Sequence, residues 1–273
     1  MTVADLGNLV KEFDSTPKMP VLFIGHGNPM NAIEENVFTK GFRQMAGYLP
    51  QPKLILVISA HWETRGTLVT AMKEPRTIHD FGGFPPELYQ QQYPAPGSPE
   101  FAALIKHLVD EVELDHQWGL DHGAWTVLKH LFPLANVPVV SLSLDRGKDA
   151  KSHFALGREL AQLRSKGVLI LGSGNIVHNL RAVDWLKINA VDYGYDWAVA
   201  AQQRINSFIL DRNYQALVDY DKLGADVLQS IPTPEHYLPL LYSLAATEAD
   251  DDLSVFNDHL LAGSLSMTSL LYA

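Results

Sequence analysis

The sequence predicts an α/β fold, with one domain built on a mainly parallel or mixed central sheet and helices on both faces. Two observations predict this class. Short runs of branched apolar residues do not alternate with polar ones, which is typical of strands covered on both faces. Segments with helical spacing of apolar residues separate these runs, an order that builds parallel sheets. Since the chain has 273 residues, of which 47% are hydrophobic, we expect a single domain over residues 1–273.

The first half of the chain opens with two such strands, at residues 20–24 and 54–58. Residues 73–97 interrupt the pattern with five prolines and several aromatic residues. Because disordered segments are poor in aromatic residues, we expect this loop to form a wall or lid over a pocket. A helix follows over residues 98–112, since a capping serine and a proline at the first helical position begin its apolar spacing.

The middle of the chain alternates between the two kinds of element. A helix over residues 125–131 precedes a strand at 137–144, where a proline suits a strand start or an edge. A second helix over 153–163 precedes a strand at 167–172, which is another continuous apolar run. This alternation favours further parallel strands in the same sheet.

The last third predicts two more helices, over residues 195–220 and 234–246, and a last strand within 264–272. The second helix has a clear start, with Thr233 as the N-cap and Pro234 at the first helical position. No repeat, low-complexity tract or interdomain linker divides the chain.

Composition excludes several classes of partner. The chain has 31 acidic and 21 basic residues, a formal charge of -10, and no Lys/Arg cluster, so nucleic acid and anionic membranes are poor partners. The first twenty residues lack the basic start and apolar core of a signal peptide, and no apolar run reaches the roughly 18 residues of a membrane span. We expect a cytoplasmic protein that is a monomer or a small homo-oligomer.

The chain has no cysteine, so any metal must be bound by imidazole and carboxylate groups. His26 and His61 each follow a predicted buried strand, and ligand crevices in α/β sheets form at the carboxyl ends of strands. If those strands are neighbours, the two histidines could share one metal ion. His178 follows a third strand and a glycine-rich turn, and it could reach the same crevice.

Two further histidines lie at predicted helix starts. His236 would be the third residue of the helix over 234–246, where the positive helix end disfavours imidazolium and keeps the ring neutral. His122 lies in a polar turn before the helix at 125–131, where it could exchange a proton without being a ligand. Taken singly, each histidine is more often a hydrogen-bonded structural residue than a ligand, so the residues alone leave both interpretations open.

The remaining histidines carry less signal. His79 lies in the aromatic loop and is a candidate for substrate contact or support, whereas a solvated or core role is favoured for the others, which are His107, His116, His130, His153 and His259. No G-x-S-x-G elbow, P-loop or H-E-x-x-H motif is present.

Eight motifs occur in an order that resembles the 4,5-DOPA extradiol dioxygenase family, within the class III extradiol ring-opening dioxygenases. They are GHGNPM, SAHWE, HDFGGFPPELY, YPAPGSPE, DHGAW, GSGNIVHNLR, TPEHYLPLLY and GSLSM. The resemblance runs from Met19 to about Met267. It implies an enzyme that inserts O2 into a catechol, such as a 4,5-DOPA-like substrate, at a mononuclear non-haem metal to give a ring-opened semialdehyde.

The resemblance also implies roles for five histidines. His26, His61 and His236 would bind the metal, and His178 would be either a fourth ligand or the base that deprotonates the catechol. His122 would face the ring and the oxygen and would supply or orient a proton.

The sequence differs from related enzymes at one proposed metal ligand. Related enzymes commonly use two histidines and one carboxylate, whereas the third position here offers His236 with Glu235 beside it. Because imidazole suits zinc as well as iron, we expect Fe(II) for turnover and Zn(II) as a possible bound metal.

The planar substrate ring could pack against His79, Phe81 and Trp62, although a core role for these aromatic residues is about as favoured. Two other functions remain open, a zinc-dependent hydrolase on the same histidines and a non-enzymatic binding protein of the same fold.

Overall fold

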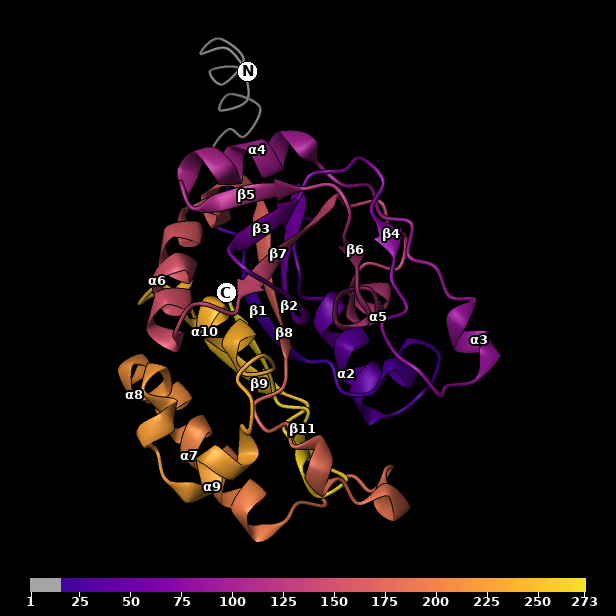
Figure 1. The fold of residues 1–273 in the computed structure, drawn as a ribbon, viewed down its shortest axis with the longest axis vertical. Helices are drawn as coiled ribbons and strands as arrows, with labels where there is room; N and C mark the ends of the chain where they lie inside the picture. The colour runs from indigo at the N-terminus through magenta and orange to yellow at the C-terminus, as the bar shows by residue number, and fades with distance from the viewer. Residues whose placement is uncertain (1–15) are drawn as a thin grey trace.

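The computed structural model describes residues 16–273 and is built on an eight-stranded sheet with helices on both faces (Figure 1). The prediction about a signal peptide rests mostly on residues 1–15, which lie outside the described part. None of the helices in residues 16–273 has the length and apolar character that crossing a lipid bilayer requires. Across the sheet, the strands follow the order β5 (Val112–Asp115), β3 (Thr67–Thr70), β7 (Val139–Asp145), β2 (Leu54–Thr64), β8 (Val168–Gly174), β1 (Val21–Gly25), β12 (Ser269–Tyr272) and β9 (Leu253–Phe256).

The centre of the sheet is parallel and its borders are mixed. Strands β7, β2, β8 and β1 run parallel, whereas β12 pairs antiparallel with β1 and with β9. At the other border β3 pairs antiparallel with β7 and parallel with β5. The predicted mainly parallel or mixed sheet is therefore confirmed.

Alternating side chains of the central strands enter two separate cores, as the period of two in a strand requires. In β1, Val21 and Phe23 belong to one apolar cluster and Leu22 and Ile24 to the other. The first cluster includes residues of α4 (Pro99–Leu108), α6 (Ala150–Leu160), α7 (Asp196–Leu210) and α10 (Leu238–Ala245). The second cluster includes residues of α2 (Val37–Ala46) and α5 (His122–Leu131). Both faces are covered, which explains why the strands are continuously apolar.

Shorter elements complete the described chain. Two small sheets pair β10 (Leu260–Leu261) with β11 (Leu265–Ser266) and β4 (Arg76–Thr77) with β6 (Gly119–Leu120). The short α-helices are α3 (Pro86–Tyr89), α8 (Tyr214–Val218) and α9 (Ala225–Ser230), and the 3-10 helices are η1 (Pro29–Ala32), η2 (Ala161–Lys166), η3 (Leu180–Ala182), η4 (Trp185–Lys187) and η5 (Tyr220–Lys222). In Figure 1, α7, α8 and α9 gather at the lower left, below α6 and α10.

Two predicted helices are shorter than the apolar spacing indicated. The helix over 98–112 ends at Leu108, because Val109 is extended and Val112 already begins β5. The helix over 195–220 is interrupted after α7, where Arg212 adopts a positive φ of 52° and Asn213 caps the separate helix α8. Apolar spacing continues across both breaks, so periodicity alone did not reveal them.

The start predicted for the helix at 234–246 is wrong. Helix α10 begins at Leu238, and residues 235–237 form a turn before it. The Thr233 hydroxyl donates to the Glu235 carboxylate and does not cap the helix. The backbone carbonyl of His236 accepts a hydrogen bond from the backbone N–H of Asn175. Tertiary contact with the end of β8 therefore overrides the local start signal, and His236 lies before the helix.

Candidate metal centre

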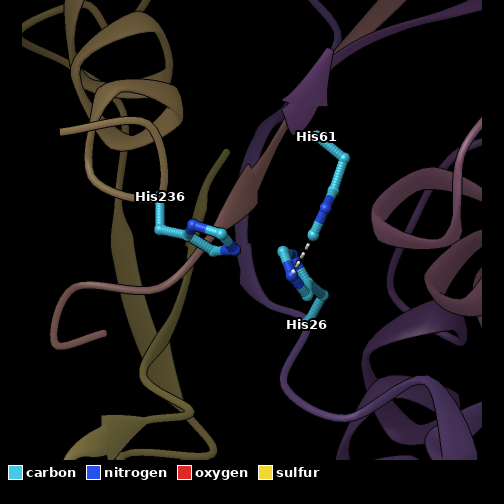
Figure 2. Close-up of side chains that lie close together, drawn as sticks. All are labelled: His26, His61 and His236. Carbon is cyan, nitrogen blue, oxygen red and sulfur yellow. Dashed lines mark hydrogen bonds between the residues drawn. The ribbon is translucent and has the colours of Figure 1, made fainter. Parts of the chain in front are cut away.

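Three histidines from distant parts of the chain meet at the carboxyl end of the sheet (Figure 2). His26 directly follows β1, and His236 lies in the turn before α10. His61 lies inside β2, two residues beyond Ser59, which is the last residue of β2 that pairs with β8. The expectation that His61 follows its strand is therefore wrong, since β2 continues to Thr64.

Strands β1 and β2, which position His26 and His61, are not neighbours, although the shared metal site was expected to need neighbouring strands. Strand β8 lies between β1 and β2. This arrangement still brings the rings together, because Ser173 near the end of β8 supports His26 from between them. The Ser173 hydroxyl lies 3.0 Å from Nδ1 of His26 and donates its own hydrogen to the Gly123 carbonyl oxygen at 2.6 Å.

The Nε2 atoms of His26 and His61 lie 3.1 Å apart, at the contact that Figure 2 marks with a dashed line. One ligand atom from each of His26, His61 and His236 lies within 4.8 Å of the other two. Two ligand atoms bound at about 2.1 Å to one ion lie about 3.0–3.4 Å apart in octahedral or tetrahedral geometry. The 3.1 Å spacing of His26 and His61 is therefore that of two ligands of one ion, and His236 lies close enough to be the third.

The polar atoms beside each neutral ring favour the proton on Nδ1 and leave Nε2 as an acceptor. The Ser173 hydroxyl oxygen accepts from Nδ1 of His26, because its hydrogen is already used. The Asp80 carboxylate lies 3.3 Å from Nδ1 of His61, and the Glu235 carboxylate lies 3.2 Å from Nδ1 of His236. The facing lone pairs on His26 and His61 would repel each other unless a cation lies between them, so these residues fit a metal ion.

Burial keeps these rings neutral. His26 is 2% exposed and His236 is 7% exposed. Burial, followed by the neighbouring histidines, lowers the pKa of both well below the usual range. Burial and the charge of His122 likewise lower the pKa of His61 to about 3, against the opposing charge of Asp80. The neutral state of His236 thus comes from burial and its neighbours, not from a helix end.

His178 and His122 complete the group on two sides. The ring of His178 stacks on that of His236 with centroids 3.5 Å apart and planes 10° apart, and burial lowers its pKa to about 4. His122 is the first residue of α5, and its ring centroid lies 3.9 Å from that of His61. All five histidines singled out in the sequence therefore lie together.

The five histidines line one cavity of about 300 Å³. One part of its wall is polar, with Asn28, Asp80 and Asn175, and the rest is apolar. The apolar residues of the wall are Pro29, Phe84, Leu180, Val183, Trp185, Ile188, Leu261 and Leu265. The cavity therefore places the histidines beside a mostly apolar wall.

The three residues expected to contact a substrate ring do not line this cavity. His79 hydrogen-bonds the Gln91 carbonyl oxygen at 2.9 Å, and Trp62 is buried and stacks on Trp118. Phe81 packs edge-on against His122 with centroids 5.6 Å apart. Their role in substrate binding stays a prediction, whereas Phe84 of the same loop does reach the cavity.

Sequence reasoning assigned no supporting role to two carboxylates and one hydroxyl that lie around the histidines. Asp80 contacts two of the rings, and Ser173 supports a third. Asp121 is fully buried and accepts hydrogen bonds from the Ser59 hydroxyl and the Ala124 amide at the start of α5. Burial, followed by the charge of Asp80, raises the pKa of Asp121 to about 6. Asp80 and Asp121 each directly neighbour a histidine in sequence, which was the available signal.

Gly174, the last residue of β8, permits the close approach of the turn that carries His236. An added Cβ would lie 2.1 Å from the His236 carbonyl oxygen. We expect Gly174→Ala to displace His236, weaken metal binding at least tenfold, and cost about 1–3 kcal/mol of stability through overpacking. Titration with Zn(II) and urea denaturation measure these effects. Gly82→Ala is the control, since its Cβ would meet open space. A Gly174→Ala variant with unchanged metal affinity would show that the close approach does not matter.

Comparison with known proteins identifies a family that matches most of the chain. Residues 17–261 match the family described as the catalytic LigB subunit of aromatic ring-opening dioxygenase. The 4,5-DOPA dioxygenase extradiol of Escherichia coli strain K12 is 45% identical over 263 residues, which cover 94% of this chain and 95% of that protein. The 4,5-DOPA dioxygenase extradiol of Beta vulgaris is 35% identical over 255 residues, covering 90% and 94%.

A solved structure has the same fold. The crystal structure of an uncharacterized protein from Escherichia coli K12 superposes with a TM-score of 0.79 at 40% sequence identity. The match covers 94% of this chain and all of that one.

Proposed function

Because the chain belongs to the LigB family of aromatic ring-opening dioxygenases, which are oxidoreductases, we propose that it inserts O2 into a catechol by extradiol cleavage. The product would be a ring-opened semialdehyde, and the reaction would take place at a mononuclear non-haem metal. The observation that carries this proposal is the convergence of the Nε2 atoms of His26 and His61, 3.1 Å apart, on one cavity.

We propose that His26, His61 and His236 hold this metal through Nε2. A bound metal would supply Lewis acidity at the catechol oxygens and the redox chemistry of oxygen insertion. Three neutral imidazoles accept iron and zinc alike, so Fe(II) is proposed for turnover and Zn(II) as an alternative bound metal. Glu235 supports His236 through Nδ1 in this proposal, which leaves the third ligand position to imidazole.

The other two histidines are proposed to move protons. His178 is neutral at pH 7, since its pKa is about 4, so its ring can accept the proton of a catechol hydroxyl that the metal has made more acidic. His122 donates Nδ1–H to Asp80 at 3.0 Å. Its Nε2 is then the atom that takes up or returns a proton at the reacting ring.

The names of two relatives favour a 4,5-DOPA-like catechol as the substrate. The substituent of the ring would lie against the apolar wall that includes Val183, Ile188 and Leu261. The single catalytic domain over residues 1–273, the cytoplasmic location and the monomeric or small homo-oligomeric state stay predictions.

Reconstitution with Fe(II) tests the proposal. Incubated under air with a panel of catechols that includes 4,5-DOPA-like compounds, the protein should consume one O2 per catechol and form a yellow ring-opened product. The same catechols with one hydroxyl methylated are the control, because they cannot offer both oxygens to the metal. An iron-loaded protein that leaves every catechol intact, or a zinc-loaded protein that hydrolyses esters instead, would contradict the proposal.

A further inference from the structure

Asp80 contacts two histidines that have different proposed roles. Its Oδ2 atom lies 3.3 Å from Nδ1 of His61 and 3.0 Å from Nδ1 of His122. Its Oδ1 atom accepts a hydrogen bond from the backbone amide of His122 at 2.8 Å. The side chain is 17% exposed and lines the cavity. One carboxylate from the loop before α3 therefore joins β2 to the start of α5.

The chemistry of these contacts determines where the ring protons lie. An ionised carboxylate is only an acceptor, so His122 donates Nδ1–H to Oδ2 at 3.0 Å, and the 3.3 Å contact favours the same proton position in His61. A neutral imidazole has one such proton, which leaves Nε2 of both rings as an acceptor. For His61 that atom is the proposed metal ligand, and for His122 it is the proposed proton acceptor at the substrate.

We propose that Asp80 is a positioning residue that sets the tautomer and orientation of both rings at once, and so couples the metal site to the proton-handling histidine. This inference rests on the proposed function of the site. The start of α5 has a second support besides Asp80, because Asp121 caps that helix through the Ala124 amide and is itself held by Ser59. A change at Asp80 should therefore act on the two rings more than on the helix.

Asp80→Asn tests the inference with almost no change in shape. The amide has an acceptor oxygen and a donor nitrogen. In one orientation its N–H faces the backbone N–H of His122, and in the other it faces Nδ1–H of His61 and His122. If the amide N–H faces the rings, each must move its proton to Nε2, where the proton blocks a metal. Asp80→Ala only removes the acceptor, so Asp80→Asn should be the more damaging variant. Asp149→Asn is the matched control, since Asp149 caps α6 at the surface.

Two measurements are needed. Zn(II) affinity, measured by competition with a chromophoric chelator, should fall about 10–100-fold in Asp80→Asn, as is typical when the support of a ligand is lost. The kcat of the Fe(II)-saturated protein on its best catechol should fall at least tenfold in the same variant, with a smaller change in KM. Asp149→Asn should match the wild type in both measurements.

Three results would overturn the inference. The first is wild-type metal affinity in Asp80→Asn. The second is lower metal affinity with an unchanged kcat at saturating metal, since His122 would then be independent of Asp80. The third is a loss of thermal stability in Asp80→Asn and Asp80→Ala with metal affinity and kcat intact, which would assign Asp80 a structural role. The metal titration needs no catechol, so a protein that cleaves none would refute the proposed function while still testing the effect of Asp80 on His61.

Discussion

His26→Ala should lose both the bound metal and ring-opening turnover, whereas His178→Ala should keep most of its metal and lose turnover. The Nε2 atom of His26 lies 3.1 Å from that of His61, so its removal takes away one of three proposed ligands. His178 stacks on His236 and is not one of the three ligands proposed. As a general base it should contribute about 10²–10⁴-fold to kcat.

Metal content of the purified variants and O2 uptake at saturating Fe(II) measure the two effects separately. His107→Ala is the control, since His107 is exposed in α4, away from the cavity. Equal metal loss in the His26 and His178 variants would make His178 a fourth ligand instead of a base.

Asp251→Ala should cause a large loss of stability. Both oxygens of Asp251 accept hydrogen bonds from the Arg164 guanidinium, at 2.6 and 2.8 Å, and the two side chains are at most 1% exposed. Arg164 also donates to the carbonyl oxygens of Met19 and Ala246, so it joins the chain before β1 to the end of α10. Removal of one partner leaves the other charge buried and unpaired, which costs about 3–5 kcal/mol.

Urea denaturation at pH 7 measures this loss. Asp250→Ala should leave the midpoint unchanged, because Asp250 only contacts Lys18 at the surface. The double variant Asp251→Leu with Arg164→Met should be more stable than Asp251→Ala, since no charge is then left alone. An Asp251→Ala variant as stable as the wild type would show that Arg164 finds other partners.

The same pair predicts a dependence of stability on pH. Burial alone would raise the pKa of Asp251, but hydrogen bonds from Arg164, the Glu248 amide and Lys18 hold it at about 2, below its ordinary value of 3.8. A carboxyl whose folded pKa is depressed stabilises the protein above its unfolded pKa. The stability that depends on Asp251 should therefore be complete near neutral pH and disappear as the pH falls from about 4 to about 2.

Several features of the fold could be predicted from local patterns. Continuous apolar runs identified the four central strands, because both faces of those strands are buried. Element ends were harder to predict. Helix α4 stops before Val112, and α10 starts after His236, because backbone breaks and contacts with other segments override apolar spacing and capping residues.

The candidate site was also predictable only in part. The position of His26 after its strand and the absence of cysteine pointed to imidazole ligands at the end of the sheet. That β8 lies between β1 and β2 was not predictable, since strand order is a property of the packed sheet. Ser173 was consequently not recognised as the support of His26.

By itself the sequence determined the fold class, the family and the five histidines, because strand periodicity and motif order are local properties. Only the tertiary structure decided which atom of each ring faces the cavity. That choice depends on one polar oxygen beside Nδ1 of each ring. For the three proposed ligands these oxygens belong to Ser173 on β8, Asp80 in the loop before α3 and Glu235 in the turn before α10. Two of the three come from elements other than that of the histidine they support, so folding had to bring them together.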